Sequence, residues 1–306
     1  MTTTQKILVA TDLSAPARHA VVRAKRLATS LGSELHIMHA LELDTLEFSL
    51  REILGSELSA VKEALLEDAR EHLRQQAGDP ESYQGGGVET RVVIGNPLLT
   101  IAAEADAVDA GLLVLGARGD SFLRHTLLGS TVARLMRKSF ARPVLVVKQP
   151  PRESYRSIIV AVDFSPVSIK ALQLAKQFAP DIDLVLMHAF ELPFEGKMVY
   201  AGVNEKLISS YVASESKTRL KQLHDLAAEA GLGFSHYSAR VIHGDPWQQI
   251  LSLEQEIGAD LIVVGKHGTH VTEELLLGSV TKHVLAESQC DVLVVADPRP
   301  GKPELP

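Results

Sequence analysis

Apolar residues follow two alternating patterns along this chain. Runs of four or five consecutive apolar residues, as at 7–10, 112–115, 158–162 and 261–264, are typical of strands buried on both faces of a sheet. Between these runs, apolar residues recur every three or four positions, as over 17–31, which predicts amphipathic helices. Alternating buried strands and helices predict an α/β fold with a parallel, doubly wound, Rossmann-like sheet.

Polar residues mark where these helices begin and end. Ser14 and Asn96 are expected N-caps, and each has a proline within the next two positions. Gly32 is expected to end the first helix. The longest helical pattern, from about 46 to 76, carries dense charge, which is typical of a helix face in solvent.

The order of elements repeats with a period of about 150 residues. Met38-His39-Ala40 reappears as Met187-His188-Ala189, and each copy reads as β-α-β-α-β-α-β-α-β. We therefore predict two tandem domains, at 1–148 and 157–297. A polar linker at 149–156 joins them, and a proline-rich tail follows at 298–306.

One glycine pattern, G-x2-G-x9-G-S, occurs once in each copy. It begins at Gly116 and at Gly265, in both cases between a predicted strand and a predicted helix. Glycine lets backbone N–H groups approach a ligand, and a helix start offers unpaired N–H groups with a partial positive charge. The pattern therefore predicts an anion site suited to phosphates. A single loop could be only a tight turn in which Ser130 or Ser279 caps the helix, but the repetition favours a ligand.

Ligands of doubly wound sheets bind beyond the carboxyl ends of the strands. The stretches expected there, besides the two loops, are Ala10, Thr11, Asp12 and Ala40 in the first copy and Ala161, Val162, Asp163 and Ala189 in the second. Arg118, Lys266 and His267, at the loop centres, are candidates for pairing with phosphate. For the two aspartates, the alternative is a carboxylate that only holds its own loop or caps the next helix.

This set of motifs resembles the universal stress protein family in its tandem, two-domain form. The resemblance covers nearly the whole chain. Its residues are Val9-Ala10-Thr11-Asp12-Leu13-Ser14, Val160-Ala161-Val162-Asp163-Phe164-Ser165-Pro166, the His-Ala pairs at 39–40 and 188–189, and both glycine loops. Members with such loops typically bind ATP, so the resemblance implies two adenine-nucleotide sites, with or without Mg²⁺.

The resemblance also implies roles for individual residues. Asp12 and Asp163 would lie beside the adenosine, and the backbone at Ala40 and Ala189 would meet the adenine. The residues that would line the ribose and phosphates are Gly116, Gly119, Gly265 and Gly268. Those that would hold the phosphates are Gly129, Ser130, Thr131, Gly278, Ser279 and Val280. The loop centres differ between the copies, so the two sites are expected to differ in affinity.

Composition and the absence of known motifs exclude several classes of function and of binding partner. The chain has 306 residues and a net charge of −7, which argues against a general nucleic-acid or anionic-membrane surface. The chain has a single cysteine, Cys290, so it cannot form an internal disulfide. It also has no run of 18 apolar residues. From these two observations we expect a cytoplasmic protein. The sequence has no Walker or kinase signature. We assign no catalytic or metal-binding residue.

Together with the phosphate-site pattern, the resemblance implies an ATP-binding regulatory protein of the stress response, whose nucleotide-bound conformation would be recognised by a protein partner. The two halves are expected to form a pseudo-dimer through pairing of 144–147 with 292–295. The sequence does not decide whether two such chains also form a homodimer. One alternative is a slow ATP hydrolase or phosphotransferase. The other is a scaffold that holds an apolar ligand, rather than a nucleotide, between the halves.

Overall fold

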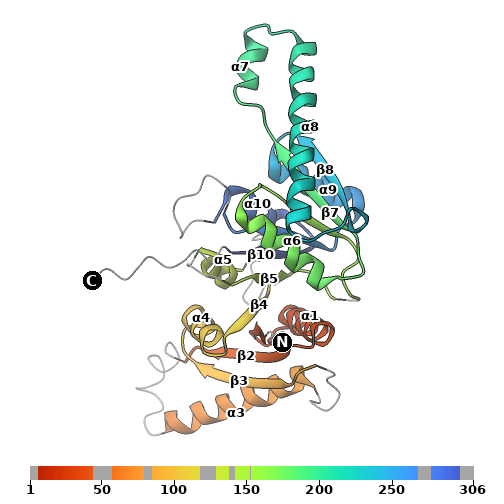
Figure 1. Cartoon of the computed structure of the whole chain (residues 1–306). Coiled ribbons are helices and arrows are strands. Elements are labelled where there is room, and N and C mark those ends of the chain that lie inside the picture. Colours follow the sequence, from red (N-terminus) through yellow and green to blue (C-terminus); the bar gives the residue numbers. More distant parts are fainter. Residues whose placement is uncertain are drawn as a thin grey trace, which may run out of the picture. The chain divides into compact units, whose positions relative to one another are not determined.

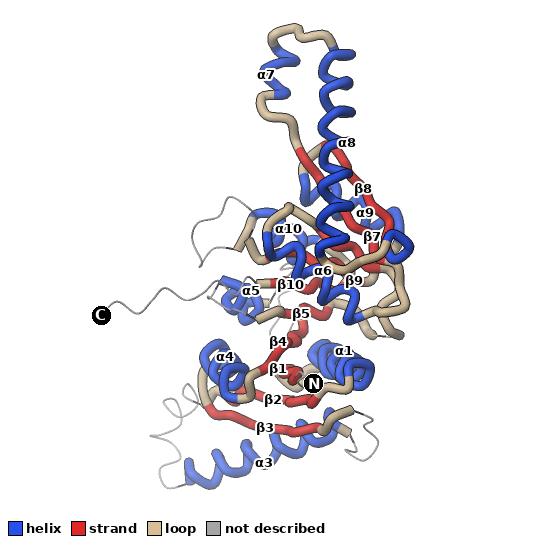
Figure 2. Tube along the Cα trace, viewed as in Figure 1, coloured by secondary structure: helices blue, strands red, loops and turns tan. Residues whose placement is uncertain are grey.

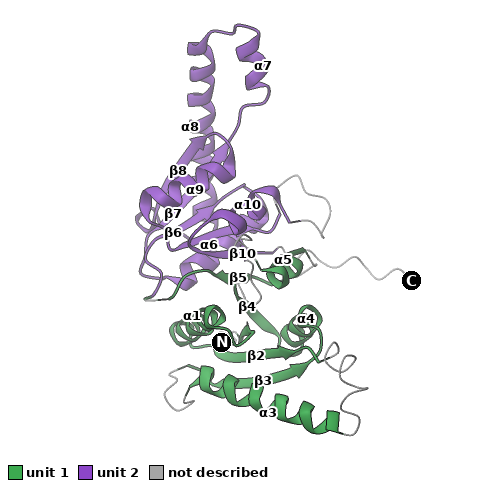
Figure 3. Cartoon of the chain, turned by 180° about the vertical axis from the view of Figure 1, so that it is seen from behind, with its two compact units in different colours: residues 1–153 green, residues 154–306 purple. Residues whose placement is uncertain are grey.

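A computed structural model describes residues 6–43, 57–78, 85–117, 129–137, 142–151, 153–267 and 277–296. The chain divides into two compact units, residues 1–153 and residues 154–306 (Figure 3). Each unit combines a sheet with helices that pack on it (Figures 1 and 2).

Unit 1 has five parallel strands in the order β3-β2-β1-β4-β5. The strands are β1 (Lys6–Thr11), β2 (Glu34–Leu41), β3 (Val88–Ile94), β4 (Ala110–Gly116) and β5 (Val144–Val147). The helices are α1 (Ala15–Leu31), α3 (Leu58–Ala77), α4 (Pro97–Ala107) and α5 (Ser130–Arg137). Helix α1 contacts α3, and α4 contacts α5. The strand order reverses between β1 and β4, as in a doubly wound sheet.

Unit 2 repeats this arrangement with the order β8-β7-β6-β9-β10, again all parallel. Its strands are β6 (Ile158–Ala161), β7 (Leu184–Phe190), β8 (Tyr237–His243), β9 (Leu261–Gly265) and β10 (Asp291–Val295). Its helices are α6 (Pro166–Phe178), α7 (Glu195–Tyr200), α8 (Glu205–Glu229), α9 (Pro246–Ile257) and α10 (Ser279–Glu287). The predicted α/β fold with two tandem, doubly wound parallel sheets is therefore confirmed.

The central strands form the core of each unit. Leu8, Val9, Leu113 and Val114 are fully buried in unit 1, and the residues of β9 before Gly265 are buried in unit 2. Burying one such side chain contributes about 1.5–3 kcal/mol. Helices cover both faces of each sheet, which explains why the strands read as continuous apolar runs rather than alternating ones.

The predicted helix ends are confirmed where the structure describes them. Ser14 Oγ accepts the N–H of Ala17 at 3.2 Å, and Asn96 Oδ1 accepts the N–H of Leu98 at 3.1 Å. Gly32 ends α1 with a left-handed backbone at φ 62°. The long helix predicted from about 46 is described from Leu58 onward, and the earlier part lies outside the described residues. Helix α7 was not predicted.

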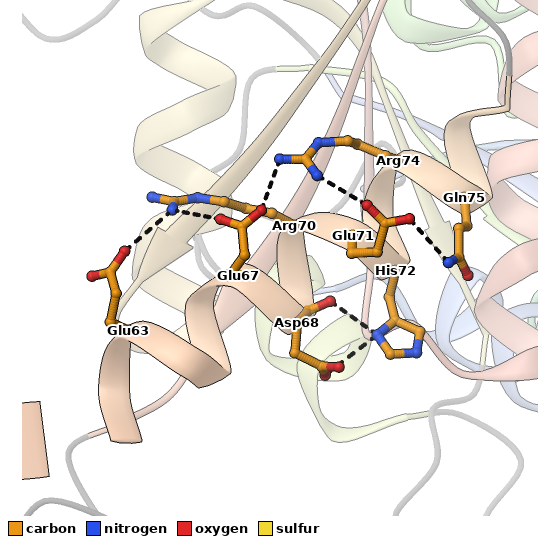
Figure 4. Close-up of polar contacts among 8 residues, drawn as sticks. All are labelled: Glu63, Glu67, Asp68, Arg70, Glu71, His72, Arg74 and Gln75. Carbon is orange, nitrogen blue, oxygen red and sulfur yellow. Dashed lines mark hydrogen bonds and ion pairs between the residues drawn. The ribbon is translucent and has the colours of Figure 1, made fainter. Parts of the chain in front are cut away.

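The charged surface of α3 carries a chain of ion pairs (Figure 4). Arg70 contacts Glu63 and Glu67, and Arg74 contacts Glu67 and Glu71. Hydrogen bonds from the two guanidinium groups, that of Arg74 foremost, hold the pKa of Glu67 below its usual value. Because the surface is exposed, water screens these pairs. It is the solvated face that the sequence predicted.

Among the described residues, no helix combines the length and the apolar character that crossing a membrane would need.

Candidate functional site

The stretches predicted to bind a ligand meet at one edge of each sheet. In unit 1, Thr11 pairs with His39 across β1 and β2, and Ala10 pairs with Leu115 of β4. Asp12, Ala40 and Gly116 therefore lie at the carboxyl ends of neighbouring strands. In unit 2, the pairs of Ala161 with Met187 and of Val160 with Val263 bring Asp163, Ala189 and Gly265 together in the same way. This edge includes the point where the strand order reverses, which is where such sheets bind ligands.

Asp163 is held by its own loop in unit 2. Its Oδ1 accepts the N–H of Ser165 at 3.0 Å, the Ser165 hydroxyl at 2.6 Å and the Ser168 hydroxyl at 2.8 Å. Phe164, between them, has a left-handed backbone at φ 62°, which turns the chain sharply after β6. The alternative interpretation, a carboxylate that holds its loop, is therefore correct for Oδ1. These bonds also fix the orientation of the carboxylate against the start of α6.

Asp12 occupies the equivalent place in unit 1, and Leu13 repeats the left-handed turn at φ 66°. The Asp12 Oδ1 accepts the N–H of Ser14 at 3.1 Å. Gln76, at the end of α3, ties the loop from the other side: it accepts the Thr11 hydroxyl at 3.0 Å and donates to the Leu13 carbonyl at 2.9 Å. Gln76 thus joins the end of α3 to the path of this loop.

His39 and His188 lie under these two loops. The Nδ1 of His39 is 2.9 Å from the Thr11 carbonyl, and the Nδ1 of His188 is 2.7 Å from the Val162 carbonyl. Because a carbonyl only accepts, each Nδ1 carries the proton. Each histidine thereby ties the second strand of its unit to the loop that carries the site aspartate.

The other side of the His188 ring is less well satisfied. Its Nε2 is buried with no hydrogen-bond partner among the described residues. The centroids of the His188 and Phe164 rings are 4.3 Å apart. Burial lowers the pKa of His188, and the positive charge of Arg219 adds to this, against opposing effects of the Val162 carbonyl and Asp163. The burial of His188 near Asp163 therefore disfavours the protonated form of its ring.

The two glycine loops close with the same backbone hydrogen bonds. In unit 2, Lys266 donates its N–H to Val295 at 2.8 Å, and Gly278 donates to the Lys266 carbonyl at 2.9 Å. In unit 1, Ala117 donates to Val147 at 2.8 Å, and Gly129 donates to Ala117 at 2.8 Å. Each loop therefore returns to the strand that it left, so the next helix begins beside that strand end. The predicted Arg118, Gly119 and Gly268 lie outside the described residues.

Helix α10 begins without a side-chain cap. Gly278 is its N-cap, with φ −56° and ψ 147°, a backbone that any residue adopts. Ser279 is the first helical residue, so the alternative in which Ser279 caps this helix is wrong. The first-turn N–H groups, those of Ser279 and Val280 among them, consequently receive no acceptor from a capping side chain, and they lie at the loop edge. In unit 1, Ser130 and Thr131 begin α5 at the equivalent place.

Close packing around Gly265 leaves little room for a side chain at this position. A Cβ there would lie 3.2 Å from the carbonyl oxygen of His267 and 3.5 Å from Cγ1 of Val167. Lys266 is only 5% exposed, so it is not the solvent-exposed cation that a loop lysine usually is. His267 is partly buried beside it. The loop thus leaves β9 through a tight, inward-facing turn.

Two residues at this edge were not predicted. Ser168 holds Asp163, and the Thr281 hydroxyl donates to the Gly265 carbonyl at 2.6 Å. Their first-copy counterparts, by position from the aspartate and the loop glycine, are Ala17 and Val132. Comparing the two copies position by position would have exposed this difference. Among the described residues, no three His, Cys, Asp or Glu side chains converge as a metal site would require.

A model of the universal stress protein family matches this chain twice, over residues 3–148 and 154–296. The chain belongs to the universal stress protein family. A universal stress protein of Methanocaldococcus jannaschii is 31% identical over 150 residues, 47% of this chain and 84% of that protein. These matches place both site edges inside family domains.

Two solved structures extend the comparison. A universal stress protein from Archaeoglobus fulgidus is 19% identical, covers 96% of this chain and 98% of its own, and superposes with a TM-score of 0.63, which shows the shared fold. Another universal stress protein, solved in complex with cAMP, is 28% identical and covers 47% of this chain and 98% of its own, with a TM-score of 0.33.

Proposed function

We propose that each unit of this universal stress protein binds an adenine nucleotide, ATP foremost, at the carboxyl ends of its central strands. The observation that carries the proposal is the uncapped start of α10 beside the end of β9, with the same loop-closing bonds repeated in unit 1. An uncapped helix start at the switch point of a doubly wound sheet suits a phosphate chain.

The residues at this edge divide between the two ends of the nucleotide. The phosphates would be held by the backbone of Gly278, Ser279 and Val280 in unit 2 and of Gly129, Ser130 and Thr131 in unit 1. The Ser279 hydroxyl is not engaged as an N-cap, so it could donate to a phosphate oxygen. The adenosine would lie toward Asp163 and the backbone of Ala189, or toward Asp12 and Ala40. Lys266 and Arg118 remain candidates for charge pairing with the phosphates.

A regulatory role follows from how Asp163 is used. A carboxylate oxygen that already accepts three hydrogen bonds, from its loop and from the first turn of α6, is suited to position a ligand rather than to remove a proton from water. The bound nucleotide would stabilise one conformation of the protein, and a protein partner in the stress response would recognise that conformation. Mg²⁺, if required, would come with the phosphates.

The experiment is calorimetric titration of the full chain with ATP, compared with Gly129→Val and Gly278→Val. Gly278 has an ordinary backbone, so valine can adopt its dihedral angles, yet a side chain there would block the approach of phosphate. We expect each variant to lose one binding event and to keep its fold by circular dichroism. If both variants bind as much ATP as the wild type, the glycine loops do not bind phosphate.

Pairing of the two halves within one chain, through 144–147 and 292–295, remains a prediction, as does any homodimer. Cross-linking mass spectrometry at a concentration where the chain is monomeric would test the first, and light scattering would test the second.

A further inference from the structure

The two candidate sites share their loop-closing backbone bonds but differ in their side-chain hydroxyl groups. Ser168 in unit 2 corresponds to Ala17 in unit 1, five residues after the site aspartate in each case. Thr281 corresponds to Val132, three residues after the last loop glycine. Both differences place a hydrogen-bonding side chain in unit 2 and an apolar one in unit 1.

Two other positions differ in the opposite sense, because unit 1 has Thr11 and Thr131 where unit 2 has Val162 and Val280. The Thr11 hydroxyl bonds to Gln76 and to the Leu13 N–H, whereas the two unit 2 hydroxyls bond to the site aspartate and to the end of β9.

Ser168 acts on the aspartate itself. Its hydroxyl lies 2.8 Å from Asp163 Oδ1 and 3.2 Å from the Asp163 N–H, so it joins the carboxylate to the first turn of α6. Ser168 is 3% exposed, which protects these bonds from competing water. Ala17 cannot hold Asp12 in this way. The Gln76 bonds in unit 1 act on the Thr11 hydroxyl and on the Leu13 carbonyl.

Thr281 acts at the phosphate end. Its hydroxyl donates to the carbonyl of Gly265 at 2.6 Å, and its side chain comes from the first turn of α10. The bond therefore fixes the start of α10 against the end of β9, the two elements between which the phosphates would lie. Val132 has nearly the same shape but no hydroxyl. In unit 2 both ends of the site are thus fastened by side chains before any ligand arrives.

We propose that unit 2 holds the tighter of the two nucleotide sites, with Ser168 and Thr281 as its positioning residues. This ranking of the two sites by affinity rests on the proposed function, and it means that the unit 2 site fills first. A site whose groups are already fixed loses less conformational freedom on binding. From the usual net contribution of one buried hydrogen bond, each hydroxyl should change ATP affinity by roughly threefold to tenfold.

The test uses the full chain with one site blocked at a time, titrated with ATP by calorimetry. The Gly129→Val protein, in which only unit 2 binds, should have a lower Kd than the Gly278→Val protein. In the Gly129→Val background, Thr281→Val and Ser168→Ala should each weaken binding, while Thr281→Ser, which keeps the hydroxyl, should retain it. Thermal unfolding of each variant separates a loss of affinity from a loss of fold.

The reciprocal changes, which add a hydroxyl to unit 1, test the ranking even if a variant that removes a hydroxyl from unit 2 fails to fold. In the Gly278→Val background, Val132→Thr and Ala17→Ser should tighten binding at unit 1. Equal Kd values in the two blocked proteins, tighter binding at unit 1, or hydroxyl variants with unchanged affinity would overturn the ranking while leaving nucleotide binding in place. Absence of ATP binding by the unmodified chain would instead refute the proposed function, and the ranking with it.

Discussion

The imidazole of His188 places its Nδ1 2.7 Å from the carbonyl oxygen of Val162, and the centre of the ring lies 4.3 Å from that of Phe164. The ring thereby links β7 to the residue just before Asp163. Because burial lowers the pKa of His188, the neutral form is the one that the folded protein accommodates.

This coupling predicts a pH dependence of stability. The unfolded chain binds a proton at His188 near its ordinary pKa of about 6.5, whereas the folded chain resists it to lower pH. The free energy of unfolding should therefore fall as pH drops below about 6.5, by at most about 1.4 kcal/mol per pH unit from this one group. Urea unfolding at a series of pH values measures it.

The matched variant is His188→Asn, whose amide can still donate to the Val162 carbonyl but does not titrate. Its unfolding free energy should depend less on pH than that of the wild type below pH 6.5. Identical pH profiles for the two proteins would show that His188 titrates normally in the folded state.

Gly265 and Gly196 should respond in opposite ways to alanine. A Cβ at Gly265 would lie 3.2 Å from a backbone oxygen, whereas at Gly196 in α7 it would meet nothing within 4 Å. We expect Gly265→Ala to cost about 1 kcal/mol of stability. Gly196→Ala should gain up to about 1 kcal/mol, because alanine favours the helix. Thermal and urea unfolding of both variants measure this, and a stable Gly265→Ala protein would show that the turn relaxes freely.

Gln76 should matter to unit 1, and its neighbour Gln75 should not. Gln76→Leu leaves the Thr11 hydroxyl and the Leu13 carbonyl without their partner, which should cost about 1–3 kcal/mol. It should also weaken ATP binding in the Gly278→Val background, where only unit 1 binds. Gln75 is exposed and bonds to Glu71 on the same helix, so Gln75→Leu is the control. Equal effects of the two changes on stability and affinity would contradict this account.

The parts of the fold that depend on local sequence were predictable. The side chains of Ser14 and Asn96 cap helices within three residues, and the apolar runs define strands because both faces of each sheet are covered. Helix α7 escaped prediction because six residues containing a glycine are too short to show a period.

The sequence predicted where the site lies, but not the side-chain hydrogen bonds that hold it in place. The aspartates and glycine loops stood out because both copies carry them. Thr281 could not be found in the same way, because its partner is a backbone carbonyl 16 residues earlier. Ser279 was a plausible cap by residue type, yet Gly278 takes the N-cap position. The burial of Lys266 depends on tertiary packing, against the usual preference of lysine for solvent.

The most direct measurement is the nucleotide content of the purified, unmodified chain. The protein would be incubated with ATP, freed of excess nucleotide and denatured, and the released material would be identified and counted by chromatography and mass spectrometry. The account predicts adenine nucleotide in amounts approaching two per chain at saturation, with one retained longer on dilution. ADP in place of ATP would show hydrolysis and favour the enzymatic alternative. No released nucleotide, together with no ATP binding in solution, would contradict the account and leave the glycine loops as structural turns.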